Sequence, residues 1–286
     1  MTTEAISEAF SQAQLNSSNH NRNHINLRKL FKSLDDDSSV DFIKGFIGAV
    51  ERSLNYQKSK NYVDRTIAFA TTYLNYSINK DLEELVDVDE SPTINLASDL
   101  LKHFLKGFKA KDKFIRFKCV QIVNLILSFI GAMDEDLFDN LQSNLLEKLL
   151  DKEANVRAQA TLALCKLQGS DDEDLTITNA LTNSLQIDPS HLVRRTALIN
   201  VFPTQHTVLP LLTRVRDVDA ITRKSVFEGS KLSEYLKEPK SIRLSPRENV
   251  IRAGLGDRDS NVKQSCSNLL SIWLDKANGD LQVVSY

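Results

Sequence analysis

A short lysine-rich segment is the part of the sequence best suited to bind an anion. Residues 102–118 contain seven basic side chains and a single acid, Asp112. Helical spacing places Lys102, Lys106 and Lys109 on one face of a helix. Cations at a helix N-terminus are repelled by the positive end of the helix dipole, so lysines there are unfavourable on their own. A bound phosphate makes the electrostatic energy favourable, because the free N–H groups and the lysines then both face an anion. We therefore expect a phosphate-binding site formed by Lys102, Lys106, Lys109, Lys111 and Lys113.

A second basic segment lies close to the N-terminus, and it contains no acid before Asp35. Its His20 and His24 are four residues apart, as in zinc proteases, but Asn21 replaces the glutamate of that motif and no third ligand is evident. We therefore expect a polar or basic helix surface without a metal, and we expect Arg22 and Lys29 to assist phosphate binding. The basic residues of this segment are His20, Arg22, His24, Arg28, Lys29 and Lys32.

Motifs of catalysis and nucleotide binding are missing from the sequence. It contains no Gly-x-Gly-x-x-Gly, Gly-x-x-x-x-Gly-Lys, Gly-x-Ser-x-Gly or Cys-x-x-Cys. Its three cysteines, Cys119, Cys165 and Cys266, are far apart and each lies in an apolar-periodic stretch, which is typical of reduced, buried thiols inside cells. We expect neither an enzyme nor a cofactor.

Composition narrows the class of protein further. The 36 Lys plus Arg against 38 Asp plus Glu in 286 residues exclude a uniformly basic coat for nucleic acid, so any basic site is local. Only 9 Gly and 6 Pro favour long helices. The longest apolar run, residues 120–133, is too short to cross a bilayer, and the first residues fit neither a secretory nor a transit leader. We expect no membrane partner and a nuclear or cytosolic location.

Apolar residues recur every three or four positions through most of the chain, which predicts an all-α protein. Two helix starts are marked by a serine before a proline, Ser91-Pro92 and Ser245-Pro246, and Ser245 has capping-box spacing to Glu248. An acidic run over residues 81–90 reads as a solvated connection.

A short pattern recurs at intervals that fit helix pairs. Four of its five copies have an aspartate six residues before a basic residue, and all five have a β-branched residue directly before that base. The third residue after the base is always small or slim, as close helix packing requires. The basic residues, spaced by 41, 37, 29 and 40 positions, are Arg116, Arg157, Arg194, Arg223 and Lys263.

The pattern resembles the HEAT repeat, in which paired helices stack into a curved solenoid. This resemblance implies an armadillo-like α–α superhelix. We expect irregular helical repeats with an acidic loop over residues 1–90, with helices within 4–33 and 39–80, and HEAT repeats in one continuous solenoid over 91–286. The expected pairs are 92–109 with 113–131, 135–150 with 154–168, 174–187 with 191–201, 206–215 with 219–235, and 246–256 with 260–275.

A longer stretch resembles one particular family. Residues 101–121, continuing through 130–138 to 151–160, are similar to the N-terminal part of the G-type HEAT-repeat subunits of condensin, the CAP-G family. Shorter matches are Arg22-Asn23-His24, Asp188-Pro189, Arg216-Asp217-Val218 and Gly279-Asp280-Leu281.

The resemblance implies a non-catalytic subunit that docks on the kleisin subunit of condensin, joins the SMC ATPases through it, and grips double-stranded DNA during mitotic chromosome condensation. It also implies a location in the nucleus and on chromosomes. Members of this family are several times longer than 286 residues. We therefore expect a fragment whose last repeat, around Trp273, exposes an apolar face.

Three alternative interpretations of these residues stay open. The exposed lysines are also compatible with a solvated face that pairs with the acids of residues 81–90. The repeat arginines are expected to pair with inter-repeat aspartates more often than with a ligand. The second functional class is a HEAT scaffold that binds a partner peptide without touching nucleic acid.

Overall fold

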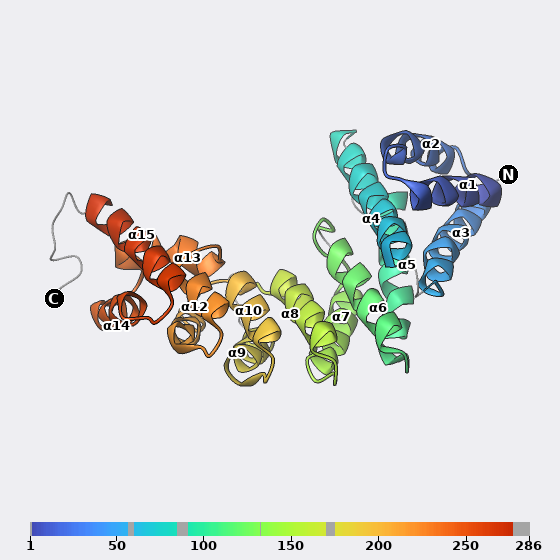
Figure 1. Cartoon of the computed structure of the whole chain (residues 1–286). Helices are drawn as coiled ribbons and strands as arrows, with labels where there is room; N and C mark the ends of the chain where they lie inside the picture. Colours follow the sequence, from blue (N-terminus) through green and yellow to red (C-terminus); the bar gives the residue numbers. More distant parts are fainter. Residues whose placement is uncertain (1, 57–59, 85–90, 132, 170–174, 277–286) are drawn as a thin grey trace. The chain divides into compact units, whose positions relative to one another are not determined.

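The computed structural model describes residues 2–56, 60–84, 91–131, 133–169 and 175–276 (Figure 1). These residues form helices, turns and loops and no strand, so the all-α prediction is confirmed. The chain divides into two compact units, residues 1–144 and 145–286.

The first unit begins with helices around an aromatic core. The rings of Phe10 and Phe46 meet edge to face at 5.1 Å, and Phe10 meets Phe69 in the same way. These rings and Tyr73 are almost wholly excluded from solvent, which supplies much of the apolar burial that stabilises this unit. Its helices are α1 (Thr2–Leu15), α2 (His20–Lys32), α3 (Asp36–Leu54), α4 (Lys60–Glu83), α5 (Pro92–Lys106), the 3₁₀ turn η2 (Gly107–Lys109) and α6 (Lys113–Ile126).

The unit boundary falls within α7 (Glu135–Lys148). The second unit continues with short helices that match the expected pairs within a few residues. They are α8 (Ala154–Leu167), α9 (Thr176–Ile187), α10 (His191–Asn200), α11 (Val208–Leu212), η3 (Thr213–Arg216), α12 (Ala220–Phe227), α13 (Lys231–Leu236), η4 (Pro239–Ser241), α14 (Leu244–Leu255) and α15 (Ser260–Lys276).

Two local expectations need correction. The helix expected over 219–235 is broken into α12 and α13 because Gly229 adopts φ +78° and Ser230 starts a new capping box. Helix α14 begins at Leu244, so Ser245 lies inside its first turn and is not the cap. On α15 the exposed residues are polar or charged, while Leu270, Ile272 and Leu274 are half-buried, so the apolar face expected on the last repeat stays a prediction.

The other serine cap is confirmed. The Ser91 hydroxyl accepts a hydrogen bond from the amide of Ile94 at the start of α5, and it donates one to the carboxylate of Asp81 at 2.8 Å. Both side chains are buried. The start of α5 is thereby tied to the end of α4.

Small residues set the distance between paired helices. A Cβ atom on Gly107 would overlap the thiol of Cys119, and one on Gly254 would lie 2.5 Å from that of Cys266. All the slim residues of the repeat register are buried. Burial raises the pKa of the Cys119 and Cys266 thiols to about 12, which is the behaviour of packing residues rather than nucleophiles.

A repeated arginine–aspartate contact joins consecutive helix pairs in the second unit. Each arginine donates Nε–H and Nη2–H to the two carboxylate oxygens of the aspartate in the following turn, at 2.6–2.9 Å. This side-on geometry gives two parallel charge-assisted hydrogen bonds. The pairs are Arg157 with Asp188, Arg194 with Asp217, and Arg223 with Asp257.

Each arginine also donates hydrogen bonds to backbone carbonyl oxygens of the turn that precedes its own helix. Nη1 of Arg194 donates to the carbonyl oxygens of Asp188 and Pro189, and Nη1 of Arg116 in the first unit donates to those of Ala110 and Lys111. These carbonyls lie six and five residues before the arginine, which explains the spacing of the register. The prediction that repeat arginines pair with inter-repeat aspartates is confirmed for Arg157, Arg194 and Arg223.

We expect Asp217→Ala to destabilise the second unit by about 3–5 kcal/mol, because it leaves the Arg194 guanidinium in a largely buried site without its anion. Urea unfolding measures the change. Glu248→Ala is the control, since its contact with Arg252 is 3.9 Å long and exposed, and it should cost less than about 0.5 kcal/mol. Similar losses in the two variants would contradict the structural role of the contact.

Candidate nucleic-acid interface

The five candidate lysines surround one turn of the first unit. Lys102 and Lys106 lie on α5, Lys109 ends η2, Lys111 lies in the turn, and Lys113 is the first residue of α6. All five side chains are exposed. The structure therefore places the predicted residues together, in the order in which the sequence presents them.

The apolar register of α5 turns these lysines outward. Leu101, Phe104, Leu105 and Phe108 are all buried, so the intervening positions face solvent. At the start of α6, the Asp112 side chain accepts a hydrogen bond from the amide of Phe114 at 2.7 Å and caps the helix. The turn thus presents a fixed backbone with flexible cationic side chains.

The acids of the upstream run have other partners. Asp81 and Glu84 accept hydrogen bonds from Arg28 at 2.7 and 3.0 Å, and Glu83 pairs with Lys80. In the described part of the chain, four of the candidate lysines have no carboxylate within 4.0 Å; they are Lys102, Lys106, Lys109 and Lys111. The alternative in which these lysines pair with residues 81–84 therefore has no support, and residues 85–90 lie outside the described residues.

Two other bases of the 102–118 segment do not face outward. Lys118 is buried and pairs with Asp64, while its ammonium also donates to Gln121 at 2.8 Å. Arg116 is buried against the turn carbonyls. The local excess of positive charge is therefore smaller at the surface than the sequence indicates.

Arg22 and Lys29 are exposed on α2, which packs against α1 and α4. Helix α4 in turn packs against α5 and α6. Arg22 lines a groove of about 440 Å³ between α1 and α2 that also contains Glu8, so its surroundings are less favourable for an anion than those of the lysine turn.

The expectation of a basic surface on α2 is wrong for His24 and Arg28, which are both buried. The His24 imidazole stacks on Phe69 at 4.8 Å, and its Nε2 lies 3.2 Å from the Phe69 carbonyl oxygen. Desolvation by burial lowers the pKa of His24 to about 4. His24 is therefore neutral near pH 7, and it is a core residue that cannot contribute charge to an interface.

We expect acidification to weaken the fold through His24. Because its folded pKa lies below the unfolded value of 6.5, the unfolded chain binds the extra proton, and stability falls as pH drops from about 6.5 toward 4. Between pH 7 and 5 the loss attributable to this residue is on the order of 2 kcal/mol. Urea unfolding at both pH values measures it.

The comparison variants for this measurement are His24→Gln and His206→Gln. The first should abolish that share of the pH dependence, whereas the second changes an exposed histidine and should leave it intact. An unchanged pH dependence in His24→Gln would show that other groups cause the loss.

A second basic site was missed by the sequence analysis. Arg216, Arg252 and Arg258 line one groove of the second unit. Arg216 and Arg258 each lie next to a register aspartate, at Asp217 and Asp257, and this adjacency was the available signal.

No helix in the described part of the chain is both long and apolar enough to span a membrane.

Comparison with known proteins identifies relatives over most of the chain, although no family model matches it. Condensin complex subunit 3 of Schizosaccharomyces pombe is 33% identical over 244 residues, which is 83% of this chain and 26% of that protein. The proteins of the same name from Saccharomyces cerevisiae and Homo sapiens are each 28% identical over 97% of this chain. The chain spans between a quarter and a third of the length of these relatives.

A solved structure shares the fold as well. The crystal structure of the S. pombe condensin Cnd3–Cnd2 subcomplex contains a chain that superposes with a TM-score of 0.81 at 29% identity. The match covers 98% of this chain and 34% of that one. The HEAT-repeat fold predicted from the register is therefore confirmed.

Proposed function

The chain belongs, by homology over most of its length, to the condensin complex subunit 3 family, and on that basis we propose that it is a non-catalytic HEAT segment of condensin that binds double-stranded DNA. The observation that carries the DNA-binding part is the α5–α6 turn. It presents five exposed lysines, of which four have no carboxylate partner in the described chain. Lys102, Lys106, Lys109, Lys111 and Lys113 contact phosphates, with Arg22 and Lys29 in an assisting role.

Phosphate contact by lysine has a definite consequence for specificity. A lysine ammonium is a point charge with flexible reach, so it neutralises the backbone without reading base edges. Binding is therefore largely independent of base sequence, and much of its free energy comes from release of counterions.

The proposed partners follow from the relatives. The similar S. pombe chain was crystallised in a Cnd3–Cnd2 subcomplex, and we assign the corresponding kleisin as the direct partner of this chain. The SMC ATPases join indirectly through the kleisin, and the location is the nucleus and chromosomes. Helix pairs suit such docking because a stack of them offers an extended surface.

We expect the slope of log K against log salt, measured for binding to duplex DNA, to report the number of phosphates that the chain contacts. If about five phosphates are neutralised, log K falls against log salt with a slope near −4 to −5.

Changing Lys102, Lys106, Lys109, Lys111 and Lys113 to glutamate should abolish binding measured by fluorescence anisotropy. A matched variant with Lys44, Lys152, Lys237, Lys263 and Lys276 changed to glutamate has the same net charge and should retain the slope. Unchanged affinity in the first variant would refute this site.

We expect a kleisin and SMC proteins to co-purify with the tagged chain, and to do so after nuclease treatment, because the kleisin contact is protein-mediated. Mass spectrometry of the bound fraction identifies them. The glutamate variant of the α5–α6 turn should retain the kleisin while losing duplex DNA. Recovery of unrelated partners without a kleisin would favour a general HEAT scaffold.

A further inference from the structure

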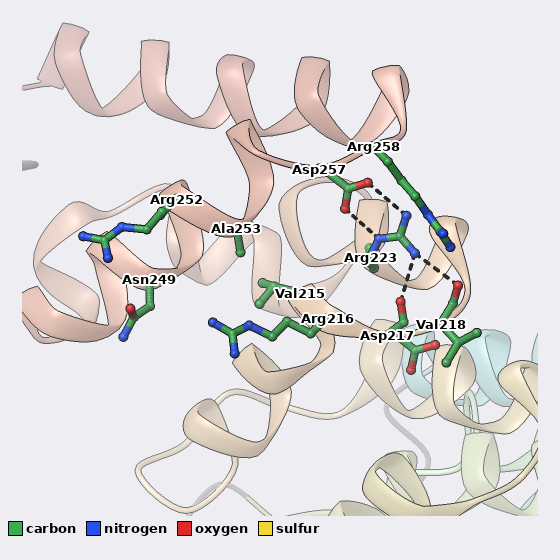
Figure 2. Close-up of a pocket in the computed structure, with 10 residues that line it drawn as sticks. All are labelled: Val215, Arg216, Asp217, Val218, Arg223, Asn249, Arg252, Ala253, Asp257 and Arg258. Atoms are coloured by element: carbon green, nitrogen blue, oxygen red, sulfur yellow. Dashed lines mark hydrogen bonds and ion pairs between the residues drawn. The ribbon is translucent and has the colours of Figure 1, made fainter.

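A groove of about 670 Å³ lies between two neighbouring turns of the second unit (Figure 2). One wall is formed by η3 and the turn before α12, and the other by α14 and the turn before α15. The Arg223–Asp257 pair links the two walls. This groove shares no residue with the lysine turn, so its function is independent of the DNA-binding proposal.

The acids of the groove are already satisfied. Asp217 accepts hydrogen bonds from Arg194, Arg214 and the amide of Asp219, and it is buried. Asp257 accepts from Arg223 and from the amide of Asp259. Neither carboxylate is available to attract a cation, so the charge offered to a ligand is set by the remaining arginines.

Three arginines around the groove are exposed. Within the described residues Arg216 and Arg258 have no carboxylate within 4.0 Å, and Arg252 has only a 3.9 Å contact with Glu248. Figure 2 shows the Arg216 side chain extending from η3 toward α14, on the side where Asn249 lies. The rim therefore offers planar donors that suit carboxylates.

The rest of the groove lining includes apolar side chains and the side-chain amide of Asn249, which can form hydrogen bonds with a peptide backbone. Val218 is 83% exposed, and Val215 and Ala253 form apolar parts of the wall. Asn249 is exposed, and its amide can both donate to and accept from a peptide backbone. The exposed Val218 offers an apolar contact that an aliphatic side chain of a peptide can cover.

We propose that this groove binds an extended segment of a partner protein in which acidic and aliphatic residues alternate. Successive side chains of an extended peptide point to opposite sides, so carboxylates can reach the arginine rim while aliphatic groups cover the exposed Val218. The Asn249 amide pairs with the backbone of the segment. The three exposed arginines of the rim favour an acidic segment, because complementary charges across an interface steer association and suppress wrong partners.

The test uses a fluorescein-labelled synthetic peptide, Asp-Leu-Glu-Val-Asp-Leu-Glu-Val, and the full chain. The change of Arg216, Arg252 and Arg258 to glutamine should weaken its binding at least tenfold in fluorescence anisotropy. A matched variant with Lys152, Arg243 and Lys263 changed to glutamine should bind as the unaltered chain does, since these exposed bases lie outside the groove. A peptide with serine in place of each aliphatic residue should bind several-fold more weakly.

Three results would overturn the proposal. The first is no binding of the alternating peptide up to about 1 mM, the weak end of specific association. The second is equal affinity for the serine peptide, which would reduce the site to a charge effect. The third is loss of duplex DNA binding, with peptide binding unchanged, when the three groove arginines are replaced, which would make the groove a nucleic-acid site.

Discussion

The side-on contact between an arginine and the aspartate of the following turn holds the second unit together. Each arginine satisfies two carbonyl oxygens of its own turn and both oxygens of the next aspartate, so one side chain fixes the turn and the step to its neighbour. Burial alone would raise the pKa of Asp217, but hydrogen bonds from Arg194 and the Asp219 amide lower it. The aspartate therefore stays charged inside the stack, and its contribution to stability is present above its unfolded pKa and lost as pH falls through the lowered value.

The same contact determines which bases are free to bind a ligand. An arginine at the register position is bound by an aspartate within the fold, as Arg223 is by Asp257. A base one residue before or after a register aspartate is exposed at the surface, as Arg216 and Arg258 are. At the α5–α6 turn the rule is similar, because Arg116 is buried against carbonyls and the lysines around it are exposed. Whether a basic side chain stabilises the fold or is exposed for binding is thus decided by its position in the repeat and not by its residue type.

Around α2 and α4, charge is mostly internal. Arg28 binds Asp81, Asp81 accepts from Ser91, and Ser91 caps α5, so a chain of hydrogen bonds runs from α2 to the start of α5. This network uses part of the acidic run that the sequence offered as a partner for the lysines. The described acids of that run are bound by Arg28, Lys32 and Lys80, which leaves Lys102, Lys106, Lys109 and Lys111 without a carboxylate among the described residues, the condition for an electrostatic interface with phosphates.

The sequence by itself determined the all-α class, the helix pairs and the HEAT register, because apolar periodicity and the aspartate–arginine spacing are local properties of the chain. It also indicated that the five lysines lie around one turn, since they fall within a dozen residues of one another, whereas their role as a binding site stays a prediction. Only the tertiary structure decided that His24 and Arg28 are buried and that Arg216, Arg252 and Arg258 share a groove. Those facts depend on contacts between residues far apart in the chain, and burial can reverse what a residue's type alone indicates.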